Sequence, residues 1–412
     1  MIKKSNTIKK KKKPWVSKKY DRRGKIVWLF CFLYAKIKYG FHYKLFKDTK
    51  KRGYLILYNH QTSWDEFFIG LNFKRNVYLV ATEDIFNLGL ATKIIQWFAN
   101  PIPIRKSISD LKAVKICMKV AKEGGSLGIA PEGNRTYSGE TCNIQPAIAK
   151  LAKKLQMPII LYNIRGGYGV RPRWSNDIRR GRIDGVINRI IEPEEYNSMS
   201  ESDLLLAIRE GLYIDESYRE VAVKSKRLAE HLERMVYVCP ICGLSEFASD
   251  GAAIKCTHCG FTLKYTAHNT FEGEKPVFKN VKEWYHYQED FINKLDVNKL
   301  DGVIYSDEAK LREVILYKRK NVLFKQMHFE LYNNRYVIKH ADEKIELNFD
   351  DIIVTSVLGK NKMQIYCNND KVYQVSGGNS FNALKYVNIY FRYKNLKEGN
   401  TNNDNSSNFL GL

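Results

Sequence analysis

The sequence predicts an α/β domain built on a mixed, largely parallel sheet, followed by a small region that is mainly β. Between residues 53 and 195, short apolar runs alternate with longer patterns of helical period, which is typical of parallel strands joined by helices. Between residues 327 and 375, short apolar segments are separated by turn-forming asparagines and carry no helical period. The chain has 412 residues, enough for roughly two to three domains.

The N-terminal 50 residues are strongly basic. They contain 17 lysines and arginines against two acids, in a chain whose net charge is +24. Such a tail suits nucleic acid, an anionic membrane surface or solvent alone. The run Ile26–Ala35 is apolar and aromatic but much shorter than the ~20 residues of a bilayer span. We therefore expect a basic tail over residues 1–25 and an amphipathic membrane-interface segment over residues 26–50.

Two features predict that the chain is cytosolic. We expect a peripheral protein at the cytoplasmic face of the cell membrane, without a full transmembrane helix. The basic start and apolar middle resemble a signal peptide, but Leu33-Tyr34-Ala35 continues into Lys36 without a convincing cleavage site. Four of the eight cysteines are scattered and suggest no disulfide framework. These are Cys31, Cys117, Cys142 and Cys367.

The α/β domain is expected over residues 51–228. Its buried strands are predicted from four short apolar runs, namely Tyr54–Tyr58, Val77–Ala81, Leu127–Ala130 and Ile159–Ile164. Two amphipathic helices are predicted at Asp110–Glu123 and Pro146–Leu155. Reactive groups in such folds gather at the carboxyl ends of strands, where His60 would lie.

The stretch Y-N-H-Q-T-S-W-D-E follows the first predicted strand and places His60 five residues before Asp65. In a continuous helix these side chains would be ~140° apart, but they can meet across a strand-to-helix turn. Ser63 and Glu66 have the spacing of a capping box, which predicts a helix start at this point. Asp65 would then fix one imidazole tautomer and stabilise the imidazolium. The alternative is that Asp65 only complements the helix dipole.

Two further segments follow apparent strands. In I-A-P-E-G-N-R-T, at Ile129–Thr136, Gly133 permits an unusual backbone angle or close ligand approach, and Arg135 offers a planar fork for phosphate. Glu132 would orient that arginine or a substrate hydroxyl. The segment N-P-I-P-I-R-K brings Arg105 after another short extended piece. Alone, the first segment is equally consistent with a turn that carries a surface ion pair, and the second is better explained as a solvated basic loop. Together with His60 and Asp65, the segments predict one site.

This set of motifs resembles the lysophosphatidic acid acyltransferase family of glycerolipid acyltransferases. The similar blocks are N-H-Q-T-S-W-D at 59–65, P-I-P-I-R at 101–105, P-E-G-N-R-T at 131–136 and M-P-I-I at 157–160. The resemblance covers about residues 26–225 and implies a glycerolipid acyltransferase-like mixed sheet flanked by helices. Asn134 stands where the family usually has Thr or Ser, and the fourth block lacks its usual second proline. These departures leave the acceptor open.

The resemblance implies that His60 removes a proton from a lipid hydroxyl that attacks an acyl thioester, with Asp65 stabilising the imidazolium. Four residues would hold the acceptor's glycerol phosphate: Arg105, Glu132, Gly133 and Arg135. The donor would be acyl-CoA or acyl carrier protein, and the acceptor a lysophospholipid, foremost 1-acylglycerol-3-phosphate, giving phosphatidate. The chemistry requires no redox or metal cofactor.

Two C-x2-C-G knuckles predict a zinc ribbon over residues 235–266. The cysteines are Cys239, Cys242, Cys256 and Cys259, with 13 residues between the pairs. Four thiolates suit one structural zinc and leave no open position for catalysis, and a redox pair is the alternative. His258 lies inside a knuckle and is expected to be exposed rather than a ligand.

The remaining chain is predicted to contain a helical linker (267–300), a pleckstrin-homology-like β domain (301–396) and a disordered tail (397–412). The short strands and closing helix expected there are His328–Leu331, Lys344–Leu347, Met363–Tyr366, Val372–Val375 and Asn379–Tyr393. Two other functions stay open: a catalytically weak lipid-binding adaptor, and a nucleic-acid-binding protein using the tail and ribbon. We expect no nucleic-acid partner, because that function would leave the acyltransferase-like motifs unexplained.

Overall fold

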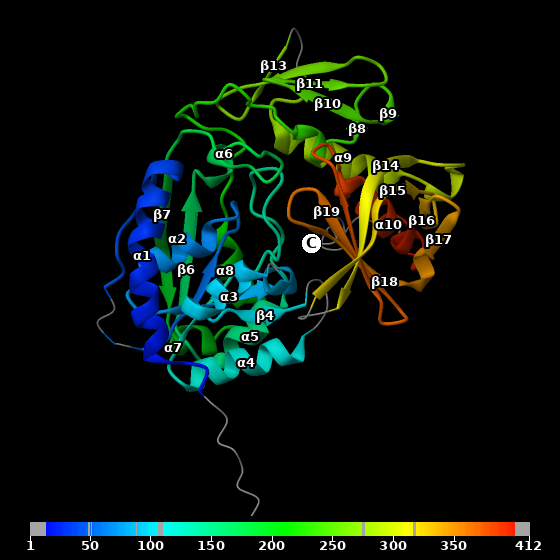
Figure 1. Cartoon of the computed structure of the whole chain (residues 1–412). Helices are drawn as coiled ribbons and strands as arrows, with labels where there is room; N and C mark the ends of the chain where they lie inside the picture. Colours follow the sequence, from blue (N-terminus) through cyan, green and yellow to red (C-terminus); the bar gives the residue numbers. More distant parts are fainter. Residues whose placement is uncertain are drawn as a thin grey trace, which may run out of the picture.

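The computed structural model describes residues 14–47, 50, 52–87, 89–105, 110–273, 277–315 and 319–399. The basic run Lys9–Lys13, Lys106 and residues 400–412 of the predicted tail lie outside the described residues. In Figure 1 the N-terminal half forms an α/β unit on one side, a green ribbon region lies above, and the yellow-to-red C-terminal region lies beside it.

A seven-stranded mixed sheet forms the centre of the α/β unit, in the order β1-β7-β6-β2-β5-β3-β4. The strands are β1 (Phe41–Tyr43), β2 (Leu55–Tyr58), β3 (Val77–Thr82), β4 (Ile102–Ile104), β5 (Ser126–Ile129), β6 (Ile159–Arg165) and β7 (Ile183–Ile191). Strands β2 to β6 run parallel, whereas β7 is antiparallel to β6. The predicted fold class is confirmed, and each strand predicted in the α/β domain is present with its ends shifted by no more than one residue.

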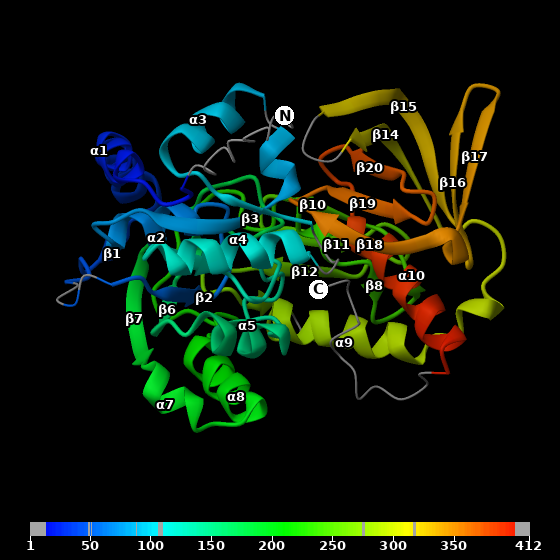
Figure 2. The same cartoon turned by 90° about the horizontal axis from the view of Figure 1, so that it is seen from below.

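Helices cover both faces of this sheet. They are α1 (Lys18–Tyr39), α2 (Asp65–Asn72), α3 (Leu90–Phe98), α4 (Leu111–Lys122), α5 (Ala147–Leu155), α6 (Gly167–Val170), α7 (Pro193–Asn197) and α8 (Glu201–Leu212), with the short 3₁₀ turn η1 (Glu83–Asn87). Leu55 and Leu57 are buried with residues of α4, α5 and α8, while Ile56 and Tyr58 are buried with residues of α1 and α2. Figure 2 shows α5 and α8 on one side and α1 and α3 on the other. Successive side chains of β2 point to opposite faces of the sheet, so they contribute to two apolar cores, one on each face.

Helix α1 runs across the predicted boundary between the basic tail (1–25) and the membrane-interface segment (26–50). It begins at Lys18, capped by the Ser17 side chain, and ends at Gly40 in the left-handed conformation. The expected boundary at residue 26 falls inside this helix. Across the described ranges, none of the helices combines the length and the hydropathy that a bilayer crossing requires.

The ribbon region consists of short strands that follow the α/β unit. They are β8 (Val238–Cys239), β9 (Gly243–Leu244), β10 (Phe247–Asp250), β11 (Ala253–Cys256), β12 (Thr262–Tyr265) and β13 (Phe271–Glu272), preceded by η2 (Leu232–Arg234). Strands β10 to β13 form an antiparallel sheet, and β8 pairs with β9. Helix α9 (Val281–Lys294) and the turn η3 (Val297–Lys299) lead to the last part of the chain.

The C-terminal β region is a second seven-stranded sheet, antiparallel throughout, in the order β17-β16-β15-β14-β20-β19-β18. Its elements are β14 (Tyr305–Ile315), β15 (Arg319–Leu331), β16 (Arg335–His340), β17 (Glu343–Asn348), η4 (Phe349–Asp351), β18 (Ile352–Leu358), β19 (Lys362–Cys367), β20 (Val372–Gly377) and α10 (Ala383–Lys397). One core joins this region, the ribbon and the α/β unit: Trp284 of α9 and Tyr386 of α10 are buried in the same cluster as Trp174. The α/β unit, the ribbon region and the C-terminal β region therefore pack directly against one another.

Candidate active site

The turn between β2 and α2 holds His60 against a buried carboxylate. His60 Nδ1 lies 2.8 Å from Asp65 Oδ2, and the Asp65 side chain is inaccessible to solvent. The same oxygen accepts the backbone N–H groups of Gln61 at 2.7 Å and Thr62 at 2.9 Å, while Thr62 Oγ1 donates to Asp65 Oδ1 at 2.6 Å. An ionised carboxylate only accepts hydrogen bonds, so His60 Nδ1 donates and Nε2 carries the free lone pair.

The capping-box prediction at this turn is wrong. The residue before α2 is Trp64, and its side chain caps nothing. Asp65, the first helical residue, instead reaches back to the two preceding N–H groups described above, so the loop is held from inside the helix. Glu66 does not return to the backbone of Ser63: its Oε1 lies 3.8 Å from His60 Nε2. Burial raises the pKa of Glu66, and the neighbouring His60 partly offsets that rise.

Glu132 fastens the end of β5 to the histidine loop. Its carboxylate accepts the backbone N–H of His60 on one oxygen and of Cys142 on the other, both at 2.6 Å. Thr136 N also donates to His60 O at 3.0 Å. Both oxygens of Glu132 bind backbone N–H groups, so this carboxylate orients the His60 loop, and its contact with a substrate stays a prediction. Burial raises the pKa of Glu132 to about 7, against the two N–H bonds, which favour the carboxylate.

Gly133 and Arg135 face a cavity. Gly133 has φ +69, a conformation that a residue with a Cβ adopts only with strain. The Arg135 side chain is largely buried, and its Nη1 is buried without a hydrogen-bond partner in the described part of the chain. Burial, together with the neighbouring Arg173, lowers the pKa of Arg135 to about 10.

The cavity has a volume of about 1200 Å³ and joins His60 to an apolar interior. Its polar end is formed by His60, Ser63, Glu66 and Arg135. Its apolar walls come from α1, α2, β3 and α3, and include Val27, Trp28, Phe67, Leu79, Ile95 and Phe98. A base beside a long apolar chamber suits a substrate with a reactive polar group and a hydrocarbon chain.

The structure brings together most of the residues that the sequence selected. His60, Gly133 and Arg135 line the cavity, and Asp65 and Glu132 hold the histidine loop from behind. Arg105 lies elsewhere: its Nε is 3.7 Å from Asp110 Oδ2, at the start of α4.

Sequence reasoning missed three contributors to the cavity, namely Glu66, Arg173 and the pair Leu358–Gly359. Glu66 was read only as a cap. Arg173 belongs to none of the motifs that the sequence analysis singled out, although it stands two residues after Arg171 and directly before Trp174. Leu358 and Gly359 lie too far along the chain for any local pattern to connect them with His60.

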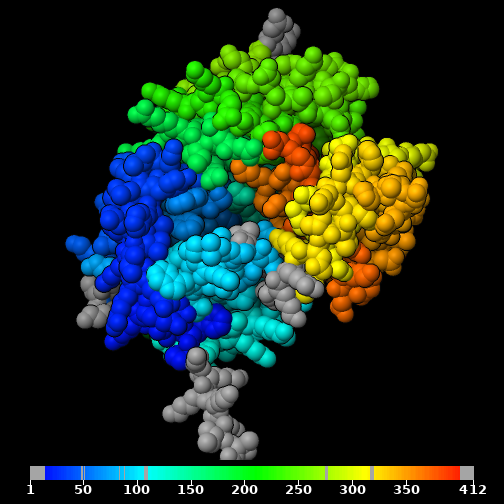
Figure 3. Space-filling model, viewed as in Figure 1, coloured from blue at the N-terminus to red at the C-terminus, as the bar shows by residue number. Residues whose placement is uncertain are grey.

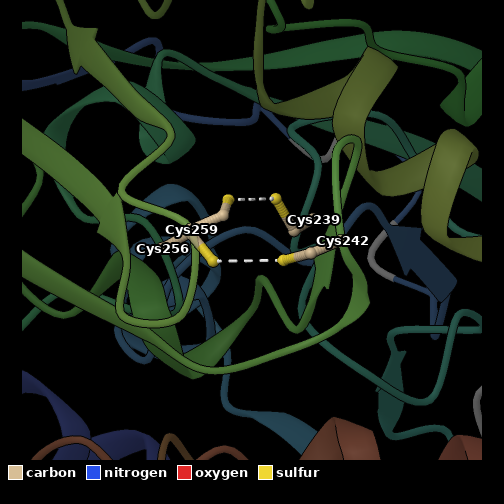
Figure 4. Close-up of side chains that lie close together, drawn as sticks. All are labelled: Cys239, Cys242, Cys256 and Cys259. Atoms are coloured by element: carbon tan, nitrogen blue, oxygen red, sulfur yellow. Dashed lines mark hydrogen bonds between the residues drawn. The ribbon is translucent and has the colours of Figure 1, made fainter.

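The four knuckle cysteines converge, as Figure 4 shows. Their sulfurs lie within 4.8 Å of one another, with Cys239 to Cys259 at 3.5 Å and Cys242 to Cys256 at 3.6 Å. A tetrahedral zinc with Zn–S bonds of about 2.3 Å places sulfurs about 3.8 Å apart, so the arrangement fits this ion. The glycine after each pair has positive φ, as the tight turns require. The expectation that His258 is exposed is confirmed.

An α/β sheet with a histidine–carboxylate pair at the end of a parallel strand is typical of a transferase or hydrolase. Residues 42–164 match the family model described as Acyltransferase, which supports the resemblance predicted from the motifs. The chain is also similar to the 1-acyl-sn-glycerol-3-phosphate acyltransferase of Borreliella burgdorferi, at 27% identity over 118 residues.

That similarity covers 28% of this chain and 47% of the relative, so the chain spans about half the length of the curated relative it matches. A crystal structure of the 1-acyl-sn-glycerophosphate (LPA) acyltransferase PlsC from Thermotoga maritima is 20% identical, covering 47% of this chain and 76% of that chain with a TM-score of 0.38.

Proposed function

We propose that this protein transfers an acyl group from a thioester donor to the free hydroxyl of a lysophospholipid. The observation that carries the proposal is the hydrogen bond of 2.8 Å from His60 Nδ1 to the buried Asp65, at the polar end of an apolar cavity of about 1200 Å³. The acyl chain occupies the apolar part, and the reacting groups meet at His60.

In the proposed reaction, the acceptor hydroxyl gives its proton to His60 Nε2 while its oxygen attacks the thioester carbonyl. The tetrahedral intermediate collapses as the C–S bond breaks, and the leaving thiolate takes the proton from the imidazolium. Asp65 stabilises the imidazolium between these two proton transfers. Both substrates are bound together, so no acyl-enzyme is needed, and holding them in place supplies much of the acceleration.

The best-supported acceptor is 1-acylglycerol-3-phosphate, with phosphatidate as product. Two features support it: the Borreliella burgdorferi relative carries that activity in its name, and Arg135 presents an unpaired guanidinium N–H beside His60. Acyl-CoA and acyl carrier protein both remain donors of the right chemistry.

We also propose that the protein works on the cytoplasmic face of a membrane. Exposed apolar residues recur every three or four positions along α1, from Ile26 to Ile37, and Leu90, Ile94 and Trp97 form a similar stripe on α3. The two helices are neighbours, since Arg23 of α1 donates to Trp97 O at 3.1 Å. Phe30 and Ile37 are 72% and 75% exposed, which suits an interface with lipid. Both helices also line the cavity, so the proposed membrane-facing surface and the cavity wall belong to the same two helices.

The four cysteines are proposed to hold a structural zinc. The ion would tie the two knuckles of the ribbon together, and because all four ligands are thiolates it would take no part in acyl transfer.

The test is acyl transfer to lysophosphatidate by purified protein, from acyl-CoA and from acyl carrier protein in parallel. His60→Ala is expected to abolish turnover while the fold stays intact, and His328→Ala, an exposed histidine on β15, is the matched control. Absence of turnover with either donor, in the presence of anionic vesicles and other lysolipid acceptors, would favour the adaptor function instead.

A further inference from the structure

Four cations from distant parts of the chain converge beside the candidate active site. Arg135 follows β5, Arg171 and Arg173 lie in the loop after α6, and Lys360 lies in the turn between β18 and β19 of the C-terminal β region. We call these four residues the cation cluster. Only Arg135 belongs to a motif of the acyltransferase family.

Arg173 connects the α/β unit to the C-terminal β region. Its side chain is 1% exposed. Its Nη1 donates to Arg135 O at 2.9 Å and its Nε donates to Gly359 O at 3.0 Å, while the guanidinium stacks 4.1 Å from the Tyr137 ring centre. The turn of the C-terminal β region is thus hydrogen-bonded to the residue that holds the Arg135 backbone.

The same turn reaches the reaction cavity. Leu358 and Gly359 line it together with His60, Arg135 and Arg173. Figure 3 shows the yellow-to-orange region lying against the blue-to-cyan part, with a hollow between them. The C-terminal β region therefore forms part of the wall of the cavity.

Lys360 is held next to this wall. Its Nζ donates to Ser175 O and to Asn176 Oδ1, the latter at 3.2 Å. An ammonium group has three donors, so these two contacts leave one for a ligand.

The cation cluster lacks counter-charges. In the described part of the chain, no carboxylate lies within ion-pair distance of any of its four members, and Asp65 and Glu66 act on Arg135 only from farther away. Arg135 Nη1 and Arg171 Nε are both buried without a hydrogen-bond partner. Buried guanidinium N–H groups without an acceptor are costly, and an anion bound between these side chains would supply one.

The electrostatics of Lys360 agree with this geometry. Burial, followed by the proximity of Arg171, Arg135 and Arg234, lowers the pKa of Lys360 to about 7, and Glu230 only partly offsets the effect. A bound anion acts in the opposite direction and favours the charged ammonium.

Packing keeps the cluster in place. Trp174, next to Arg173, is completely buried and packs edge-on against Tyr265 of the ribbon, with ring centres 5.6 Å apart. On another side of the cavity, Lys320 of β15 pairs with Asp84 of η1. The C-terminal β region is thus anchored to the α/β unit at two places around the cavity.

We propose that Lys360, Arg171 and Arg173 complete, with Arg135, a binding site for a substrate phosphate group, built jointly by the acyltransferase domain and the C-terminal β region. Assigning the phosphate to a substrate rests on the proposed acyl transfer. Either the lysophospholipid headgroup or the phosphates of the acyl donor supply this chemistry.

The first test is steady-state kinetics of Lys360→Met, with Lys371→Met as the matched control. Lys371 lies at the other end of β19, in an exposed turn of the same region. Losing one charged contact to phosphate raises KM roughly 10- to 100-fold. A rise confined to the lysophosphatidate KM identifies the acceptor phosphate, and a rise confined to the donor KM identifies the donor phosphate. Unchanged KM values for both substrates overturn the proposal.

The second test does not depend on turnover. Binding of glycerol 3-phosphate and of inorganic phosphate is measured by calorimetric titration at constant ionic strength. We expect binding to the wild type and to Lys371→Met, and weaker binding to Lys360→Met and Arg173→Met. If this pattern appears in a protein without acyl transfer, the phosphate site stands and the proposed function fails. Equal binding by all four proteins refutes the site.

Discussion

Replacement of Asp65 by Asn changes a charge while leaving the shape of the turn almost intact. The amide oxygen of asparagine can occupy the position of Oδ2 and accept the same three N–H groups, from His60 Nδ1, Gln61 and Thr62. The amide NH2 then faces Thr62 Oγ1, which can accept a hydrogen bond as well as donate one. The histidine is therefore expected to keep its position and tautomer.

The lost charge sets the size of the effect. A carboxylate and an imidazolium whose charge centres are about 4 Å apart attract by about 4 kcal/mol at an effective dielectric constant of 20. That energy is available only once His60 has taken the proton, so its loss raises the barrier and lowers kcat about 1000-fold. Folding stability falls by less, about 1 to 3 kcal/mol, because charge-assisted hydrogen bonds become neutral ones while the cost of burying the carboxylate disappears.

The assay is acyl transfer to lysophosphatidate in mixed micelles, with kcat and KM determined separately and the unfolding transition measured in urea. Glu66→Gln is the matched control, because it removes the adjacent carboxylate, 3.8 Å from Nε2 and without a hydrogen bond to Nδ1. Asp65→Asn should lose kcat with little change in KM, and Glu66→Gln should lose far less. A folded Asp65→Asn protein with kcat within 10-fold of wild type would refute the role assigned to this carboxylate.

Three further outcomes are expected. Cys256→Ser should reduce bound zinc below one per chain in metal analysis after dialysis against chelator and lower the unfolding temperature, whereas Cys31→Ser, outside the cluster, should change neither. Because the pKa of Glu132 rises to about 7 on folding, its protonated form stabilises the fold below about pH 4.5, and this contribution of about 3 kcal/mol is lost as pH rises through 7. Between pH 5 and pH 8, the free energy of unfolding measured in urea should therefore fall more for wild type than for Glu132→Gln. An equal fall in the two proteins would contradict this. Phe30→Glu should weaken binding to anionic vesicles roughly 10-fold in co-sedimentation, unlike Tyr218→Glu, an exposed aromatic away from α1 and α3.

Local sequence patterns identified four strands of the α/β unit, β2, β3, β5 and β6, and two of its helices, α4 and α5. Strand β2 and its neighbours appear as short apolar runs because both faces of a largely parallel sheet are covered by helices. The cysteine knuckles were equally recognisable, since the motif C-x2-C-G predicts both the ligands and the turn that holds them. His60 and Asp65 were also recognisable, because a strand-to-helix turn allows side chains five residues apart to meet.

The same patterns misjudged how that turn is held. Ser63 and Glu66 have capping-box spacing, yet Asp65 accepts the available N–H groups from within the helix. Glu132 was expected to orient an arginine or a substrate hydroxyl, and its bonds to the backbone of His60 and Cys142 were not predicted. Which N–H groups a buried carboxylate accepts depends on the segments packed around it, and spacing along the chain does not encode that.

The chain's composition, motifs and periodicity defined an α/β acyltransferase-like unit, a four-cysteine ribbon and a β-rich C-terminal region, because each of these depends on contacts between residues close in sequence. The cavity and the cation cluster arise only on folding. Lys360 donates to Ser175, in the loop of Arg173, across 185 positions of sequence, and Lys320 pairs with Asp84 across 236. Such contacts come from the packing of the C-terminal β region against the α/β unit through a shared core, and no local pattern in either segment specifies them.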